Sequence, residues 1–262
     1  MTKPNYTHIH MLFDRSGSMR GRESDVQGWY DTFITEQKKL PNPCTVSLAT
    51  FDTEGYDTVI DWSKLEEVPR KFRLQPRSGT PLLDAAARSI NDLGRHLSMM
   101  DESERPSKVI VIIQTDGEEN SSKEWNLDGL RNLVKTQREV YSWDFMFLGA
   151  DIDAYGAGQS MGFAQNTVAN FGNNSRGYHV VACAAAASVM RSRTTGGSVC
   201  YSSAEQKDME ATKLADQVPV TTTGATSGTV VVPVSATGTL SITDITSGHM
   251  GLDKTPSAVV VS

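Results

Sequence analysis

The stretch that decides the fold is residues 7–18, THIHMLFDRSGS. Its first seven residues contain four large apolar side chains and predict a strand. The strand runs into Asp14-Arg15-Ser16-Gly17-Ser18, which places one carboxylate and two hydroxyls at alternate positions of a loop. In parallel sheets, ligands bind at the carboxyl ends of the strands. The stretch therefore predicts a buried strand that ends in a polar binding loop.

Strand and helix patterns alternate through the first 193 residues, which is typical of βαβ units and a mostly parallel sheet. The continuous apolar run Val109–Ile113 is typical of a central strand covered on both faces. These patterns predict an α/β fold. Strands are expected at residues 7–13, 44–51, 56–62, 109–113, 144–148 and 167–171, and helices at residues 26–34, 83–97, 127–140, 152–160 and 178–193.

The composition changes near the C-terminal end of the 262-residue chain. Residues 217–262 hold 3 charged residues, 16 Ser or Thr and 9 Val. We therefore expect a domain over 1–193, a linker over 194–216 and a Ser/Thr/Val/Gly-rich tail over 217–262. Short strand patterns in this tail predict a β-rich module, a stalk, or an arm that pairs with another chain.

The charge balance excludes several classes of function. The formal net charge is −6, which argues against a basic surface for nucleic acid. No apolar run approaches the roughly 20 residues that cross a bilayer, so we expect no membrane span. The start, Met1–Asn5, is polar, so we expect cytoplasmic synthesis without a signal peptide.

The chain has three cysteines, which are too few for a disulfide framework. Cys44 is expected to be a buried thiol, and a bridge between Cys183 and Cys200 stays open.

Two further loops carry oxygen side chains. Thr80 precedes Pro81 at the start of a predicted helix and is expected to be its N-cap, whereas Asp116 follows the apolar strand. In a doubly wound sheet these loops share the carboxyl edge with the first one. Oxygen ligands without His or Cys suit Mg²⁺, and also Mn²⁺ or Ca²⁺. Two carboxylates balance a dication, so an open position favours an Asp or Glu of a protein partner. The five expected metal ligands are Asp14, Ser16, Ser18, Thr80 and Asp116.

This pattern of D-x-S-x-S, a later Thr and a D-G pair resembles the metal-ion-dependent adhesion site of von Willebrand factor A domains. The resemblance covers roughly residues 5–193. It implies a Rossmann-like three-layer sandwich with one antiparallel edge strand, and a module that binds protein partners through its metal. It also implies that coordination switches between Thr80 and Asp116.

Rival interpretations stay open. Taken singly, Ser16 and Ser18 cap a helix, and Asp116 satisfies turn amides. A strand-end Asp beside Mg²⁺ also fits phosphoryl transfer, but aspartate-based phosphatases carry a second acid two residues later, where this chain has Ser16. Arg15, the obvious cation there, is expected to face solvent. We therefore predict that the protein is not an enzyme.

A third interpretation is a structural component of a virion or another particle, as in a phage. The metal then only orders loops, and the tail docks to neighbours and forms homo- or hetero-oligomers.

Three other features are expected to be structural. Glu118 and Glu119 are interpreted as a solvated acidic loop. His8 and His10 are expected to face the core or to be hydrogen-bonded. The G-x-S-x-G sequence at residues 158–162 lies late in a helical segment, so it is not expected to form a nucleophile elbow.

Overall fold

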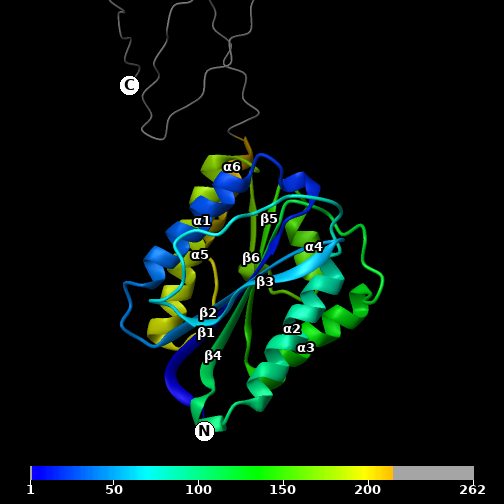
Figure 1. The fold of residues 1–262 in the computed structure, drawn as a ribbon. Coiled ribbons are helices and arrows are strands. Elements are labelled where there is room, and N and C mark those ends of the chain that lie inside the picture. Colours follow the sequence, from blue (N-terminus) through cyan, green and yellow to red (C-terminus); the bar gives the residue numbers. More distant parts are fainter. Residues whose placement is uncertain (1, 215–262) are drawn as a thin grey trace, which may run out of the picture. The chain divides into compact units, whose positions relative to one another are not determined.

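The computed structural model describes residues 2–214 and shows a six-stranded sheet with helices on both faces (Figure 1). The strand order is β3-β2-β1-β4-β5-β6, and only the β2–β3 pair is antiparallel. The strands are β1 (Lys3–Asp14), β2 (Cys44–Asp52), β3 (Gly55–Lys64), β4 (Pro106–Thr115), β5 (Asp144–Ala150) and β6 (Val168–Phe171). The predicted three-layer α/β sandwich with one antiparallel edge strand is confirmed.

Helices α1 and α5 cover one face of the sheet, and α2, α3 and α4 cover the other (Figure 1). The helices are α1 (Glu23–Gln37), α2 (Leu82–Met99), α3 (Leu127–Tyr141), α4 (Ala154–Ser160), α5 (Ser175–Thr195) and α6 (Ser203–Leu214), with 3-10 turns η1 (Gly17–Met19), η2 (Glu102–Glu104) and η3 (Gln165–Thr167). Along β1, Ile9, Met11 and Phe13 pack on the α1 side, and Leu12 packs on the α2 side. Burial on both faces makes β1 a central strand, which places Asp14 at the carboxyl edge. No helix within residues 2–214 is long and apolar enough to cross a membrane.

The folded unit extends past residue 193, into the segment that was expected to be a linker. Helix α5 runs to Thr195, and α6 spans Ser203–Leu214. Val199, Tyr201 and Met209 are at most 4% exposed and belong to the core on the α1 side. The sequence pattern gave little sign of α6, because Met209 and Leu214 are the only large apolar side chains among its twelve residues. The expected tail, 217–262, lies outside the described residues.

The start of α2 differs from the expectation. Pro81 is the N-cap residue and Leu82 the first helical residue, so Thr80 is not the cap. The Leu83 N–H donates instead to Glu119 Oε2, at 2.9 Å. Helix N-termini carry unpaired N–H groups and attract carboxylates, which explains why Glu119 is half-buried. The prediction of a solvated acidic loop is therefore confirmed for Glu118, which is exposed, and wrong for Glu119.

The histidines and cysteines largely agree with the predictions made from the sequence. His8 bonds to Thr45 Oγ1 and Ser47 Oγ, both at 2.9 Å, and His10 bonds to Ser47 Oγ at 2.7 Å. Both rings are buried and hydrogen-bonded, as predicted. Cys44 is a buried free thiol. The cysteines at 183 and 200 are free as well, so no bridge joins them.

Candidate functional site

Asp14 lies at the centre of the candidate site, at the end of β1. In the β1–β4 register Phe13 pairs with Gln114, so Asp14 lies beside Thr115. Thr115 Oγ1 donates to Asp14 Oδ2 at 2.6 Å, and the Ser16 N–H donates to Oδ1 at 2.6 Å. Burial raises the pKa of Asp14 to about 6, because desolvation disfavours the charged carboxylate. Among the described residues, no cationic side chain pairs with it.

Three more of the predicted ligands are joined by hydrogen bonds. The hydroxyls of Ser16 and Ser18 lie 2.9 Å apart. Ser18 Oγ donates to Asp116 Oδ1 at 2.6 Å. The other carboxylate oxygen of Asp116 accepts from Asn173 Nδ2 at 3.2 Å. Burial raises the pKa of Asp116, and its hydrogen bonds oppose this shift. The loops after β1, β4 and β6 therefore meet at Asp116.

Thr80 joins the group through the space beside Gly117. A Cβ atom built on Gly117 would lie 2.9 Å from Thr80 Oγ1, 3.4 Å from Ser18 Oγ and 3.5 Å from Asp14 Oδ2. Oxygens from two loops thus surround one position on the loop after β4, which the missing side chain of Gly117 leaves open. Thr80 itself is 2% exposed. The structure therefore brings all five predicted residues together.

Backbone groups hold the loop that carries Thr80 against the loop that follows β1. The Gly17 N–H donates to the Ser78 carbonyl at 2.9 Å, and Ser78 has a left-handed φ of 61°. The Thr80 N–H donates to Asn120 Oδ1 at 2.9 Å, which ties the same loop to the segment after β4. These contacts fix the position of the Thr80 hydroxyl without using it.

Arg15 does not face solvent, contrary to expectation. Its side chain is buried, and its Nε donates to Asp52 Oδ2 at 2.8 Å. Its guanidinium also contacts Asp57 on β3. Asp52 ends β2, next to the end of β1, and a buried carboxylate is costly unless a cation pairs with it. Arg15 therefore points to the β2–β3 hairpin and contributes no charge to the oxygen cluster.

The chemistry of the donor set fits a hard dication. All five side chains offer oxygen, and Mg²⁺ binds one or two carboxylates while keeping water in its remaining positions. The described residues contain no cluster of three or more His, Cys, Asp or Glu that could hold a metal, so hydroxyls and water would have to complete the coordination of an ion bound here. Asn173 Oδ1 is buried without a hydrogen-bond partner in the described part of the chain, so the site has unused polar capacity.

Neither a protein family model nor a curated protein sequence matches the chain. Solved structures do. A von Willebrand factor type A protein from Catenulispora acidiphila superposes with a TM-score of 0.54 at 16% identity, over 70% of this chain and 42% of that one. The chain has the von Willebrand factor A fold. The pilus adhesin SpaC from Lactobacillus rhamnosus GG matches with a TM-score of 0.53 at 15% identity, over 72% of this chain and 30% of SpaC. The chain thus spans less than half the length of either protein, and the likeness concerns the fold.

Sequence reasoning assigned no role in the site to three residues at this carboxyl edge of the sheet. Thr115 and Gly117 flank Asp116, and Asn173 follows β6. A polar residue at the end of a predicted strand was a usable signal for Thr115 and for Asn173. Nothing in the sequence showed that Gly117 borders Thr80, because that contact joins loops 37 positions apart.

Proposed function

We propose that this chain is a protein-binding module whose site takes Mg²⁺ and binds a carboxylate of its partner through the ion. The position beside Gly117, surrounded by oxygens of Asp14, Ser18 and Thr80, is the observation that carries the proposal. Ser16 and Asp116 belong to the same hydrogen-bonded group and complete the ligand set. Mn²⁺ and Ca²⁺ are the alternative ions, because both prefer oxygen ligands.

Each residue has a defined task in this proposal. Thr115 and the Ser16 N–H hold the Asp14 carboxylate in place, and Asn173 orients Asp116. The two carboxylates neutralise a dication, so the open coordination position of a bound ion favours an anionic oxygen from outside. An Asp or Glu side chain of a protein supplies such an oxygen.

Two observations favour binding over phosphoryl transfer, and with it a non-enzymatic role. The cation in the first loop, Arg15, is engaged by Asp52 and Asp57 and is not available to clamp a phosphate. SpaC, one of the matched structures, is a pilus adhesin, and the fold it shares with this chain is compatible with adhesion.

Calorimetric titration of the full-length chain with MgCl₂ and MnCl₂ tests the proposal. Asp14→Ala should weaken ion binding by about 100-fold, because it removes one of the two carboxylates that neutralise the ion. Asp101→Ala is the matched control, since Asp101 is an exposed aspartate between α2 and β4, at the opposite edge of the sheet. Equal affinity in wild type and Asp14→Ala would refute the metal site.

The role of the tail is a separate proposal. Residues 217–262 would assemble copies or partners into a larger particle, such as a virion. Size-exclusion chromatography of the full chain against a truncation to residues 1–214, which keeps α6, tests it. Identical monomers would end the assembly proposal.

A further inference from the structure

An apolar pocket of about 420 Å³ opens at the carboxyl edge beside Gly117. Apolar side chains from the start of α2, the start of α3 and the α4 region line it. They are Leu82, Leu83, Leu127, Ile152, Ala157 and Met161. Its volume lies in the range of small ligand sites, which are mostly apolar.

The floor of the pocket consists of buried core residues, and its walls are partly exposed to solvent. Leu82 and Met161 are buried core residues and form its floor. Leu83 and Ile152 are only partly buried against the core, and Leu127 is 36% exposed. Apolar side chains left half-covered at a functional edge mark an interaction site more often than singly scattered ones do.

The pocket adjoins the oxygen cluster at Gly117. Gly117 lines the pocket, and the position of its missing Cβ lies 2.9 Å from Thr80 Oγ1. An extended segment rises about 3.3 Å per residue. A side chain one to three residues from a carboxylate at the metal therefore reaches the pocket.

The rim of the pocket carries negative charge. Glu118 and Asp153 both line it and are both exposed. A second acid on the bound segment would be repelled there, whereas an apolar side chain meets the apolar walls. The charge pattern thus separates the carboxylate position from the apolar one.

We propose that the pocket receives an apolar side chain of the partner, held at a fixed spacing from the acid that completes the metal site. The partner is a protein segment in extended form, with Asp or Glu and a Leu-, Ile- or Met-sized residue within three positions. This inference rests on the proposed function, and it adds the specificity of the site.

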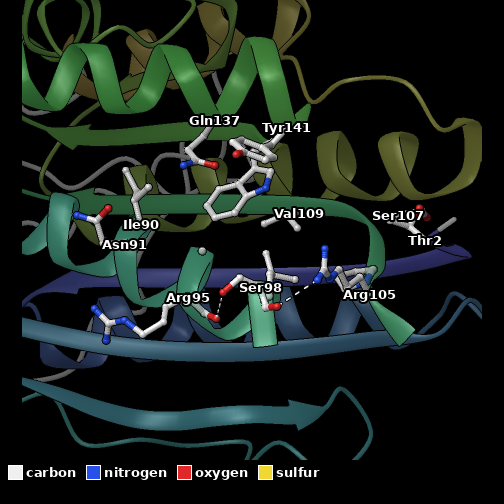
Figure 2. Close-up of a pocket in the computed structure, with 14 residues that line it drawn as sticks. Thr2, Ile90, Asn91, Arg95, Ser98, Arg105, Ser107, Val109, Gln137 and Tyr141 are labelled. Atoms are coloured by element: carbon white, nitrogen blue, oxygen red, sulfur yellow. Dashed lines mark hydrogen bonds between the residues drawn. The ribbon is translucent and has the colours of Figure 1, made fainter. Parts of the chain in front are cut away.

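A second pocket, of about 490 Å³, lies at the amino edge of the sheet and does not compete for this role. Figure 2 shows Gln137 and Tyr141 on one side of it, and Ser98 and Arg105 on the other. The Arg105 guanidinium donates to the carbonyls of Met100 and Ser98, both at 3.1 Å, so it is occupied by the chain itself. Substitutions near this amino edge, away from the oxygen cluster, serve as controls in the experiment below.

Selection of random peptides displayed on phage against the full-length chain, with MgCl₂ or with EDTA, tests the inference. Peptides enriched only with MgCl₂ should carry an acid and a large apolar residue at one preferred spacing. Replacing the apolar residue by Ala in a synthetic copy should weaken binding about 10-fold, which a buried side chain of this size accounts for.

Variants of the chain locate the effect. Leu127→Ser and the pocket-filling Ala157→Leu should each weaken the selected peptide about 10-fold. The matched controls are Val140→Ser, at an exposed site of the same helix, and Ala204→Leu, at an exposed site of α6. Both controls should bind as the wild type does. Because Mg²⁺ affinity is measured alongside, loss of folding is recognised separately.

The outcomes distinguish the two proposals. Peptides that need Mg²⁺ and an acid but have no preferred apolar position, or that bind Leu127→Ser and Ala157→Leu like wild type, refute the pocket and leave the metal site standing. A selection that yields no Mg²⁺-dependent peptide contradicts the proposed function and the pocket with it, whereas the calorimetric titration still decides the metal site.

Discussion

Two buried aspartates end neighbouring parallel strands, and their surroundings differ. Asp52, on β2, accepts from Arg15 at 2.8 Å and Arg77 at 2.7 Å, and from two backbone N–H groups. Asp14, on β1, accepts from the hydroxyl of Thr115 and one backbone N–H. Both carboxylates are at most 3% exposed. The fold therefore neutralises one of them and leaves the other without a cation among the described residues.

The difference separates a structural carboxylate from a functional one. Burying an unpaired charge is costly, and proteins normally pair it, bind a metal with it or shift its pKa. Asp52 is paired with the cations of Arg15 and Arg77. Asp14 has an elevated pKa and a polar opening at Gly117, which is the state expected of a ligand awaiting a cation.

The largest loss of stability is expected from replacing the structural carboxylate, Asp52. Asp52→Asn leaves buried Arg15 without its main counter-ion, which should cost about 3 kcal/mol of unfolding free energy. Urea unfolding measures it. Asp57→Asn is the milder comparison, because the Asp57 side chain is 60% exposed and exposed ion pairs contribute little. Equal stability of Asp52→Asn and wild type would contradict the assignment.

A loss of stability of similar size is expected in acid from the buried histidines. Asp52 is buried as a charged group, whereas these rings must stay neutral when buried. Burial lowers the pKa of His10 to about 4, so the folded state keeps this ring neutral where the unfolded chain is protonated. This stability is present above pH 6.5 and is lost as the pH falls toward 4. The loss amounts to about 3 kcal/mol.

His10→Gln should flatten the fall in unfolding free energy between pH 6.5 and 4, because it removes the titrating ring. His179→Gln, at an exposed position of α5, should keep the wild-type profile. Urea unfolding at several pH values measures both. An unchanged slope in His10→Gln would show that other groups carry the acid sensitivity.

A smaller effect should follow from filling the opening at Asp14. In Gly117→Ala the new methyl group would approach Thr80 Oγ1 to 2.9 Å and reduce Mg²⁺ affinity by about 10-fold. Gly28→Ala is the control, because nothing lies within 4 Å of its Cβ and alanine favours the α1 helix by about 1 kcal/mol. Calorimetric titration measures the affinities. Full Mg²⁺ affinity in Gly117→Ala would place the ion elsewhere.

The smallest effect is expected at the residue that orients Asp116. Asn173→Ala removes one hydrogen bond of 3.2 Å to Asp116 and should weaken Mg²⁺ binding about 5-fold, or about 1 kcal/mol. Asn166→Ala, in the 3-10 turn before β6, serves as a control for loop stability. A loss as large as that of a direct ligand would mean that Asn173 itself holds the ion.

Local patterns were enough to predict the order of strands and helices from β1 to α5, and to select the five oxygen residues. Apolar periodicity identifies β1 and β4, and the strand ends identify Asp14 and Asp116. The failures have three causes: a helix start misplaced by one residue at Thr80, long-range contacts, and a weak helix pattern. Arg15 was misplaced because its partner Asp52 lies 37 positions away, on another strand. Helix α6 was missed because its packing relies on few buried side chains and not on a strong pattern.

Calorimetric unfolding of wild type and Asp14→Asn, each in MgCl₂ and in EDTA, tests the central claim most directly. Ligands that bind only the folded state raise the melting temperature. We expect Mg²⁺ to stabilise wild type and not Asp14→Asn, and the variant in EDTA to melt no lower than wild type, since it loses an unpaired buried charge. A Mg²⁺ shift retained by Asp14→Asn, or a collapse in EDTA like that expected for Asp52→Asn, would contradict the account.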